Sequence, residues 1–562
     1  MHGVSDRRTI ICSIVTSSGP RDTSPPDDAA APPNPAQRRP VLLDPRALTG
    51  CRHRVHLDTA YPEAVADVPE DIGVQQRREA ARAFRESMRE RLMSGSARTR
   101  SWIIIDPTTR ASERAGATLR ACADGVDRIW GAVLPLEYDT GRRGRAELLV
   151  RDRERGGYIP VIVVNHKVTD PGSGAVTSGL DDWAPEVDET RKVRAQQRDQ
   201  FRLAQIHRML EHNGHASPAG VGGVIGYGGD CILVHDLSAV LDQYDERFAD
   251  RIAVARGELA TAPSQVGECR SCPWWPDCKA SLTESRDVSL VATGSRAEVL
   301  RGMGVRTIDA LAAWDGPPPE EWPGNGFDDV VVLARAWLSG IPLVRRTAEV
   351  TVTRADVEVD VDMESYQEHG AYLWGTLLTE NGVTQPYRPF VTWDPLPTVD
   401  EARSFAEFWG WLTGTLERTL ARGKTFAAYC YSRSAEDKWL LESATRFAGL
   451  PGIPAVAEVR AFVDGPHWVD VYQAVSDQFI CPNGKGLKKI APVAGFHWRD
   501  SEAGGEASMS WYRDAVGYDG EPDAAQRERL LVYNEDDVQA TKVLREWMTD
   551  RAAAEVPLAS EL

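Results

Sequence analysis

The sequence lacks the features that would place it in a membrane or outside the cell. No run of about 18 apolar residues occurs, so no transmembrane helix is expected. The N-terminus makes a poor signal peptide, because Arg7 and Arg8 precede only a short apolar stretch without a small-residue cleavage site after it. Nine cysteines is an odd count on a chain of 562 residues, which excludes a disulfide scaffold. These absences predict a cytoplasmic protein with no membrane partner.

Positive charge is also in short supply. Lys and Arg total 65 against 83 Asp and Glu, which gives a formal net charge of −18. A protein that binds nucleic acid usually has a basic surface, so such a protein would have to concentrate its positive charge locally. A phosphate-binding loop is missing as well, because Gly423-Lys424-Thr425 has Arg418 where that loop requires a glycine. The chain therefore carries no helicase motor of its own.

Composition and periodicity divide the chain into several parts, as its length predicts. Residues 1–38 are rich in Pro, Ala, Ser and Asp and are expected to be disordered. We expect an α/β domain over 39–284, with a helix at about 188–212 and a hairpin after it. A small helical unit at 285–315, a Pro/Gly linker with a short helix at 316–347, a second α/β domain at 348–552 and a tail at 553–562 complete the expected order.

Three of the nine cysteines form the arrangement C-x2-C-x5-C: Cys269, Cys272 and Cys278. Three thiolates this close suit a metal ion or an iron–sulfur cluster, and either site normally has a fourth ligand. Cys51, near the start of the same expected domain, would complete four thiolates. His53 and His56 lie beside Cys51 and would be the donors for a zinc site. Chance clustering of the cysteines is the third interpretation.

One early cysteine followed much later by C-x2-C-x5-C resembles the iron–sulfur subgroup of RecB-like PD-(D/E)XK nucleases, which implies a 4Fe–4S cluster. Residues 143–168 resemble the catalytic hairpin of that family, where two carboxylates hold Mg²⁺ and a lysine lies near the attacking water. Here Glu147 replaces the first Asp, Asn165 replaces the second acid, and Lys167 keeps the lysine. If the register is shifted so that residues 162–164 take the place of the acid and the lysine, the site loses both of these side chains.

The helical Gln-x3-Tyr of that family is also absent, since Arg202 and Ile206 stand near its place. Two interpretations of this domain stay open. Either the fold is retained for binding without cleavage, or Glu147 still binds a metal weakly.

The small helical unit places two glycines between two apolar helical stretches. Gly302 and Gly304 stand on either side of one methionine, and Arg301 and Arg306 flank them. This resembles half of a helix–hairpin–helix DNA-binding unit, in which backbone N–H groups approach a phosphate. An ordinary turn between two helices with glycine caps is the alternative.

The second α/β domain contains a strand that alternates strictly over 355–364. Apolar residues fall on one face, and five acids fall on the other: Asp356, Glu358, Asp360, Asp362 and Glu364. One interpretation is an edge strand with a solvated face. The other is that Asp362 and Glu364 project together toward a divalent cation, which relieves the repulsion between close carboxylates.

The C-terminal helix, expected at about 522–550, carries a carboxylate where a core residue belongs. Asp537 sits in the middle of its apolar stripe, which is costly unless the carboxylate is paired or binds metal, and Tyr533 lies one turn earlier on the same face. Tyr-x3-Asp after an earlier Asp-x-Glu resembles the DEDDy exonucleases of the ribonuclease-H-like superfamily. That family has one more acid, for which Glu436 is the candidate and Asp437 the alternative. Three nearby lysines could contact phosphates or form a solvated cluster: Lys485, Lys488 and Lys489.

The order of these parts resembles a RecB-like nuclease fused to a YprB-type ribonuclease-H-like domain. The resemblance implies a metal-dependent 3′→5′ exonuclease that acts on DNA strands or duplex ends, or on RNA, in DNA repair. Asp362, Glu364, Glu436 and Asp537 would hold Mg²⁺ or Mn²⁺, and Tyr533 would orient the attacking water. A different class stays open, in which both nuclease-like folds only bind nucleic acid and the protein is an adaptor for a partner helicase.

Overall fold

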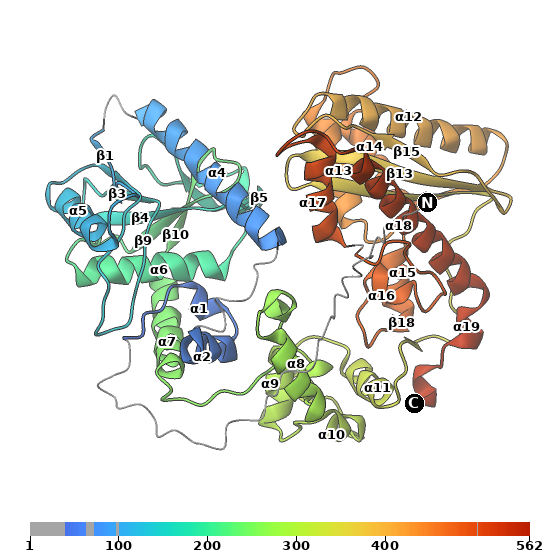
Figure 1. The fold of residues 1–562 in the computed structure, drawn as a ribbon, viewed down its shortest axis with the longest axis horizontal. Helices are drawn as coiled ribbons and strands as arrows, with labels where there is room; N and C mark the ends of the chain where they lie inside the picture. The colour runs from blue at the N-terminus through green and yellow to red at the C-terminus, as the bar shows by residue number, and fades with distance from the viewer. Residues whose placement is uncertain (1–39, 63–71, 97–99, 503) are drawn as a thin grey trace, which may run out of the picture.

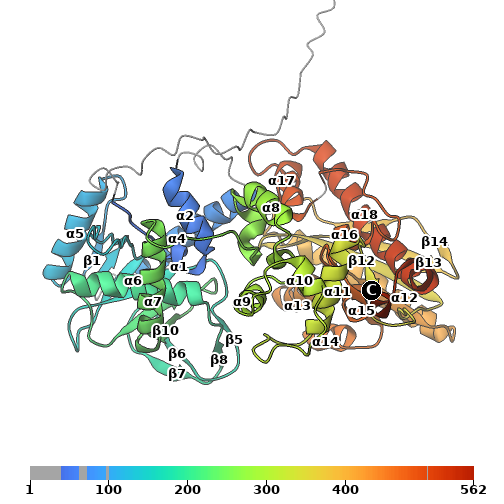
Figure 2. The same cartoon turned by 90° about the horizontal axis from the view of Figure 1, so that it is seen from below.

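The computed structural model describes residues 40–62, 72–96, 100–502 and 504–562. The segment expected to be disordered, 1–38, lies outside these residues. Two α/β domains lie beside one another, and a group of helices from α8 (Trp275–Glu284) to α11 (Phe327–Leu338) joins them (Figure 1). The view from below places α8 and α9 (Ser295–Gly302) between the two domains (Figure 2). Among the described helices, none combines the length and apolar character needed to cross a bilayer.

The N-terminal domain is built on an eight-stranded sheet in the order β1-β2-β3-β4-β9-β10-β6-β7. Its strands are β1 Trp102–Ile104, β2 Arg128–Trp130, β3 Leu148–Arg151, β4 Tyr158–Val163, β6 Ala175–Ser178, β7 Glu186–Asp188, β9 Val221–Ile225 and β10 Ile232–Asp236. Because side chains alternate along a strand, Leu148 and Val150 of β3 pack in a core with α4 (Ile72–Ser96), whereas Leu149 packs in a core with α5 (Ala111–Ala123) and α6 (Gln197–His212).

Three further helices pack on α6: α1 Arg46–Thr49, α2 Arg52–Ala60 and α7 Ser238–Ala255. The expected hairpin is present as the antiparallel pair β9–β10. The helix expected from about 188 begins only at Gln197, and this part of the prediction was wrong. Residues 186–193 form β7 and β8 (Arg191–Val193), with Asp188 accepting hydrogen bonds from the amide and hydroxyl of Thr190 in the turn between them.

The segment expected as a linker belongs to the core of the helical unit. Trp322 lies 4.9 Å from Phe327, measured between ring centroids, and both pack with residues of α9 and α10 (Ile308–Ala312). The expected tail also packs, because Leu558 bridges to Arg345 of β11 (Val344–Arg345) and Leu562 contacts an apolar cluster there. Both segments therefore form part of the folded body.

The C-terminal domain has a sheet in the order β14-β13-β12-β16-β17, and β15 also pairs with β13. Strand β12 is antiparallel to β13 and parallel to β16, which is in turn parallel to β17. The strands are β12 Val357–Tyr366, β13 Gly370–Glu380, β14 Val383–Thr384, β15 Arg388–Val391, β16 Phe426–Cys430 and β17 Trp468–Asp470. Strand β12 is thus central rather than an edge strand.

Helices cover both faces of this sheet. The helices α12 (Asp400–Ala421), α13 (Ser434–Arg446) and α14 (Val456–Val463) share a core with the apolar face of β12. The opposite face is covered by α15 Val471–Gln478, α16 Leu487–Ile490, α17 Gly505–Val516 and α18 Ala524–Asp550. The acidic face of β12 therefore meets α18 instead of water.

Candidate active site

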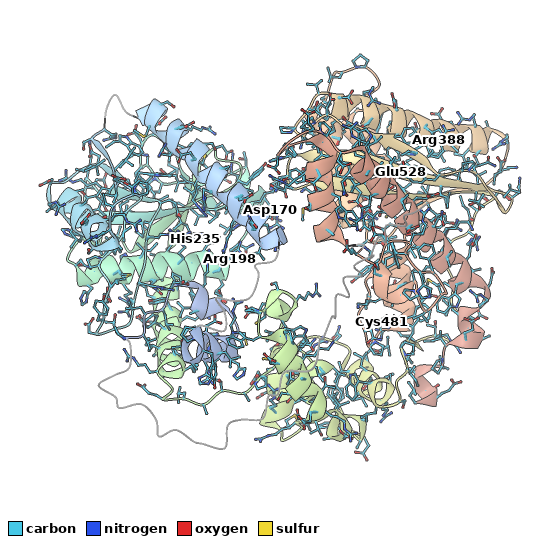
Figure 3. All side chains as sticks on the ribbon, viewed as in Figure 1. Asp170, Arg198, His235, Arg388, Cys481 and Glu528 are labelled. Carbon is cyan, nitrogen blue, oxygen red and sulfur yellow. The ribbon has the colours of Figure 1, made fainter. Side chains whose placement is uncertain are left out.

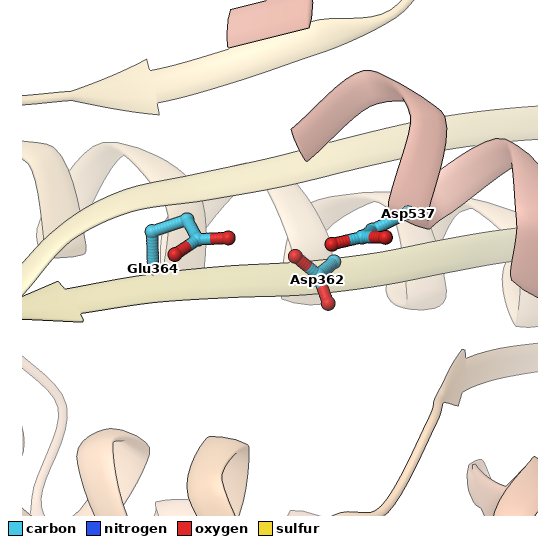
Figure 4. A group of neighbouring side chains, drawn as sticks. All are labelled: Asp362, Glu364 and Asp537. Atoms are coloured by element: carbon cyan, nitrogen blue, oxygen red, sulfur yellow. The ribbon is translucent and has the colours of Figure 1, made fainter. Parts of the chain in front are cut away.

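Three carboxylates meet where β12 faces α18. Asp362 and Glu364 come from the strand and Asp537 from the helix, and one oxygen of each lies within 4.8 Å of the others. Figure 4 shows Asp537 extending from the helix toward Asp362, with Glu364 farther along the same strand. The alternation of β12 and the inward position of Asp537 in α18 thus bring together the acids that the sequence pattern selected.

The other acids of this face have a structural role. Asp360 is fully buried and receives two hydrogen bonds of 2.8 Å from the Arg545 guanidinium of α18, which also donates to Glu358 at 2.7 Å. Among the described residues, no arginine or lysine hydrogen-bonds to the carboxylates of Asp362, Glu364 or Asp537. On the acidic face of β12, Arg545 therefore pairs with Glu358 and Asp360, whereas Asp362 and Glu364 remain without a hydrogen-bonded cationic partner among the described residues.

Neutral donors orient the carboxylates of Asp362 and Asp537. The Asn534 amide donates to Asp362 at 2.7 Å and accepts a hydrogen bond from the Tyr387 hydroxyl at 2.7 Å. The Trp498 indole donates to Asp537 at 2.7 Å. The sequence reasoning missed all three of these residues, although an amide beside Tyr533 in a buried helical stripe was a signal for Asn534.

Burial and mutual repulsion destabilise the charged forms of this cluster. The pKa of Asp362 is raised well above its usual range by burial and then by Asp537 and Glu364. Burial and the neighbouring Asp537 raise the pKa of Glu364 to about 8. Burial also raises the pKa of Asp537, although the positive charge of Lys488 acts in the opposite direction. A divalent cation would relieve both causes, and carboxylate oxygens are the donors that Mg²⁺ and Mn²⁺ prefer.

Of the two candidates for the fourth acid, the structure turns Glu436 toward the cluster. Its carboxylate is buried, one oxygen has no hydrogen-bond partner, and burial raises its pKa to about 8, with Glu364 contributing repulsion. Asp437 is held elsewhere by Arg433 at 2.6 Å and by the Trp468 indole at 2.8 Å. Glu436 lies outside the group of three that meets within 4.8 Å.

Tyr533 and Lys488 form the remaining wall of the site. The Tyr533 hydroxyl is hydrogen-bonded to Asp537 and accepts a hydrogen bond of 3.1 Å from the Lys488 ammonium, which lies 4.4 Å from the centroid of the tyrosine ring. Burial and the nearby acids raise the pKa of Tyr533 far above its usual range. Lys488 thus reaches the site from α16, whereas Lys489 is exposed and Lys485 is engaged through its carbonyl with the Tyr431 hydroxyl.

A family model of the RNase H superfamily matches residues 447–549. The C-terminal domain is ribonuclease-H-like. The matched range contains Lys488, Tyr533 and Asp537, while the acids of β12 and α13 precede it, so the match and the geometry support this identification from different parts of the domain. Neither the curated proteins nor the solved structures contain a match to this chain. A ribonuclease-H-like fold is a nuclease-type fold.

The four cysteines of the proposed cluster are neighbours in the N-terminal domain. Burial and then the thiols of Cys272, Cys51 and Cys269 raise the pKa of Cys278 to about 11. Of the described residues, no three of these thiols lie within 4.8 Å of one another. His53 is hydrogen-bonded to the Thr261 hydroxyl at 2.9 Å.

The three residues of the predicted degenerate site, Glu147, Asn165 and Lys167, do not lie within the two strands of the β3–β4 hairpin. Glu147 lies just before β3 and is bound by Arg202, at 2.7 Å. Asn165 and Lys167 were expected on the next strand, but β4 ends at residue 163 and both follow it. The Lys167 ammonium forms an ion pair of 2.9 Å with Glu442 of the C-terminal domain. The residues of β4 nearest to Glu147 are apolar, which corresponds to the alternative register in which residues 162–164 replace the acid and the lysine.

The glycines of the helical unit lie in an exposed turn between α9 and α10. Gly304 has a φ of +85°, which favours glycine, and a side chain there or at Gly302 would contact nothing within 4 Å. Arg306 is exposed. The Arg301 guanidinium forms ion pairs with Asp287 at 2.8 Å and with Glu298 at 3.2 Å.

Proposed function

We propose that this protein is a metal-dependent nuclease whose C-terminal domain hydrolyses nucleic-acid phosphodiester bonds, as a 3′→5′ exonuclease on DNA. One observation carries the proposal. Asp362, Glu364 and Asp537 bring three carboxylates within 4.8 Å of one another, without a cationic side chain bonded to them, inside a ribonuclease-H-like domain. The direction of degradation, the preference for DNA and a role in repair rest on the resemblance of the sequence to nucleases that combine a RecB-like domain with a DEDDy-type exonuclease domain.

The residues fit divalent cations. Asp362, Glu364, Asp537 and Glu436 would hold Mg²⁺ or Mn²⁺, which would supply Lewis-acid activation of water and stabilise the departing oxygen. Asn534 and Trp498 hold two of these carboxylates in one orientation. Because both donors are neutral, they orient the carboxylates without cancelling their charge.

Tyr533 acts as a hydrogen-bonding group and not as a base. Its hydroxyl is held between Asp537 and Lys488, and its raised pKa keeps it protonated. A hydroxyl fixed in this way can orient a water molecule or a phosphate oxygen. The Lys488 ammonium is the positive charge nearest to that hydroxyl and would attract the scissile phosphate.

We further propose that Cys51, Cys269, Cys272 and Cys278 hold a 4Fe–4S cluster, supported by the proximity of the four thiols and by the resemblance of their sequence spacing to that of RecB-like iron–sulfur nucleases. Cys51 is separated by more than 200 residues of chain from the other three, so the cluster would tie together the two ends of the N-terminal domain. That domain would then serve to bind nucleic acid. Asn165 stands where the second acid is expected, and the carboxylate of the first acid, Glu147, is hydrogen-bonded to Arg202.

The test is nucleotide release from a single strand labelled at its 5′ end. Wild-type protein with Mg²⁺ or Mn²⁺ should shorten DNA stepwise, and excess chelator should stop it. Asp362→Asn removes one charge facing the cations and should lower the rate by about 100-fold or more. The matched control is Glu528→Gln, which removes an exposed carboxylate from α18 and should keep the wild-type rate (Figure 3).

Two outcomes would count against the proposal. An undiminished rate in Asp362→Asn would show that the acidic cluster is not the site. If the wild type cleaves neither DNA nor RNA with any divalent cation, the adaptor function replaces the nuclease.

A further inference from the structure

The N-terminal domain contains a cleft of about 2100 Å³ that runs beside α1, α2, α4 and α6. Arginines outnumber acidic side chains among the residues that line it, although the whole chain has a net charge of −18. Arg198, one of these residues, lies on the side of the N-terminal domain toward the C-terminal domain (Figure 3). The positive charge that the composition lacks is thus concentrated in one place.

Guanidinium groups occupy the position where the degenerate nuclease site would need a metal. Arg202 donates to both oxygens of Glu147, at 2.7 and 2.8 Å, and the Val163 amide donates to one of them at 3.2 Å. The Nε atom of Arg85 lies 3.7 Å from the same carboxylate. The oxygens of Glu147 are therefore committed to donors, and a bound metal ion would have to displace Arg202.

Positive charge exceeds negative charge at this point of the cleft. Three arginines, Arg202, Arg145 and Arg46, repel the charge of Arg85, and Glu147 is the acid that offsets this repulsion. The Nε atom of Arg85 is buried and has no hydrogen-bond partner. Arg46 is exposed at the cleft and forms no ion pair among the described residues. An anion placed here would gain donors that the protein does not use.

We propose that this arginine site binds the phosphate groups of a nucleic-acid strand without a metal, and that Glu147 limits its affinity by neutralising Arg202. The inference rests on the proposed function, which makes nucleic acid the substrate. Arginine suits the task because its planar guanidinium stays charged and can bind phosphate through two parallel hydrogen bonds. The N-terminal domain would hold the strand while the C-terminal domain cleaves it.

The experiment measures binding of a fluorescent single strand of about 20 nucleotides by anisotropy, in excess chelator, so that metal and cleavage play no part. Glu147→Gln keeps the size of the side chain and its acceptor for the Val163 amide, but removes the charge that holds Arg202. It should tighten binding about fivefold or more. Arg46→Ala should weaken binding and reduce the salt dependence by about one counterion. Arg110→Ala, an exposed arginine outside the cleft, is the matched control and should change nothing.

The outcomes separate this inference from the proposed function. If Glu147→Gln, with an unchanged unfolding temperature, binds no more tightly than wild type, the inference is wrong. The inference is also wrong if Arg46→Ala binds the strand as tightly as Arg110→Ala does. This second test remains valid even if Glu147→Gln fails to fold. If Mg²⁺ strengthens binding only while Glu147 is present, Glu147 is a metal ligand instead. Binding that depends on the arginines without any cleavage would remove the proposed nuclease and leave this site.

Discussion

The hydrogen bond from Asn534 to Asp362 depends on the absence of a side chain at residue 375. Gly375 of β13 lies directly opposite Asp362 in the β12–β13 pair. A Cβ atom on Gly375 would lie 1.6 Å from Oδ1, the side-chain amide oxygen of Asn534, and 2.9 Å from the Tyr387 hydroxyl. Neither distance is tolerable, so Gly375→Ala should force the Asn534 amide away from Asp362. The variant changes no residue that would touch substrate or metal.

The expected loss follows from that one hydrogen bond. A hydrogen bond to a charged group contributes about 1.5–3 kcal/mol, and Asp362 would keep its burial without its donor. If the misplaced carboxylate costs the transition state the same amount, the cleavage rate falls by about 10- to 150-fold. The affinity for Mg²⁺ should fall as well. Initial cleavage rates, metal titration and thermal unfolding measure the three effects.

Two comparisons make this prediction specific. Gly410→Ala adds a methyl group in α12 where nothing lies within 4 Å, and it should leave the rate unchanged. Asn534→Ala should reduce the rate as Gly375→Ala does. Because the double variant has no amide left to displace, it should be little worse than Asn534→Ala alone. Full additivity of the two losses, or a wild-type rate in Gly375→Ala, would refute the reasoning.

Three other predictions concern the cysteines, the N-terminal site and pH. Protein purified without oxygen should be brown and contain iron, and Cys272→Ser should lose iron and destabilise the N-terminal domain, whereas stoichiometric zinc in the wild type would overturn the cluster. Glu147→Ala combined with Lys167→Ala should keep most of the nuclease activity, and a large loss of cleavage with binding intact would contradict this.

The pKa of Glu364 is about 8 in the folded metal-free protein against 4.5 as its usual value, so the folded state holds the extra proton. This stabilisation is complete below about pH 4.5 and is lost as the pH rises to about 8. The unfolding temperature in chelator should fall over that window, and Mg²⁺ should restore most of it. A flat profile would show that this carboxyl titrates normally.

The parts of the C-terminal site that depend on periodicity could be predicted from sequence. Strict alternation placed Asp362 and Glu364 on one face of β12, and helical spacing placed Tyr533 and Asp537 on one face of α18. Both patterns are local properties of the backbone and survive folding unchanged. The match of residues 447–549 to the RNase H superfamily confirms the ribonuclease-H-like part of the expected fold.

What depends on tertiary contact could not be predicted. Alternation treats Asp360 and Asp362 alike, and only the position of Arg545 shows that Asp360 has a structural role. Trp498 reaches Asp537 from a loop, with no pattern to mark it. The Pro/Gly-rich segment around Trp322 was expected to be a linker because composition does not reveal that the tryptophan packs on Phe327.

Buried carboxylates in this protein are held in two different ways, and the difference indicates where a cation belongs. Glu147 and Asp360 each face an arginine that donates to both carboxylate oxygens, at 2.7 and 2.8 Å for Glu147 and at 2.8 Å for Asp360. A guanidinium satisfies the charge, so these carboxylates need no metal. Asp362 receives a neutral amide donor, and Asp537 receives an indole and a hydroxyl donor, which fix their orientation without adding a positive charge. Buried charge of this kind is costly without a counterion. The two kinds of site therefore differ in whether a positive charge already faces the carboxylates, and we propose a divalent cation only where none does.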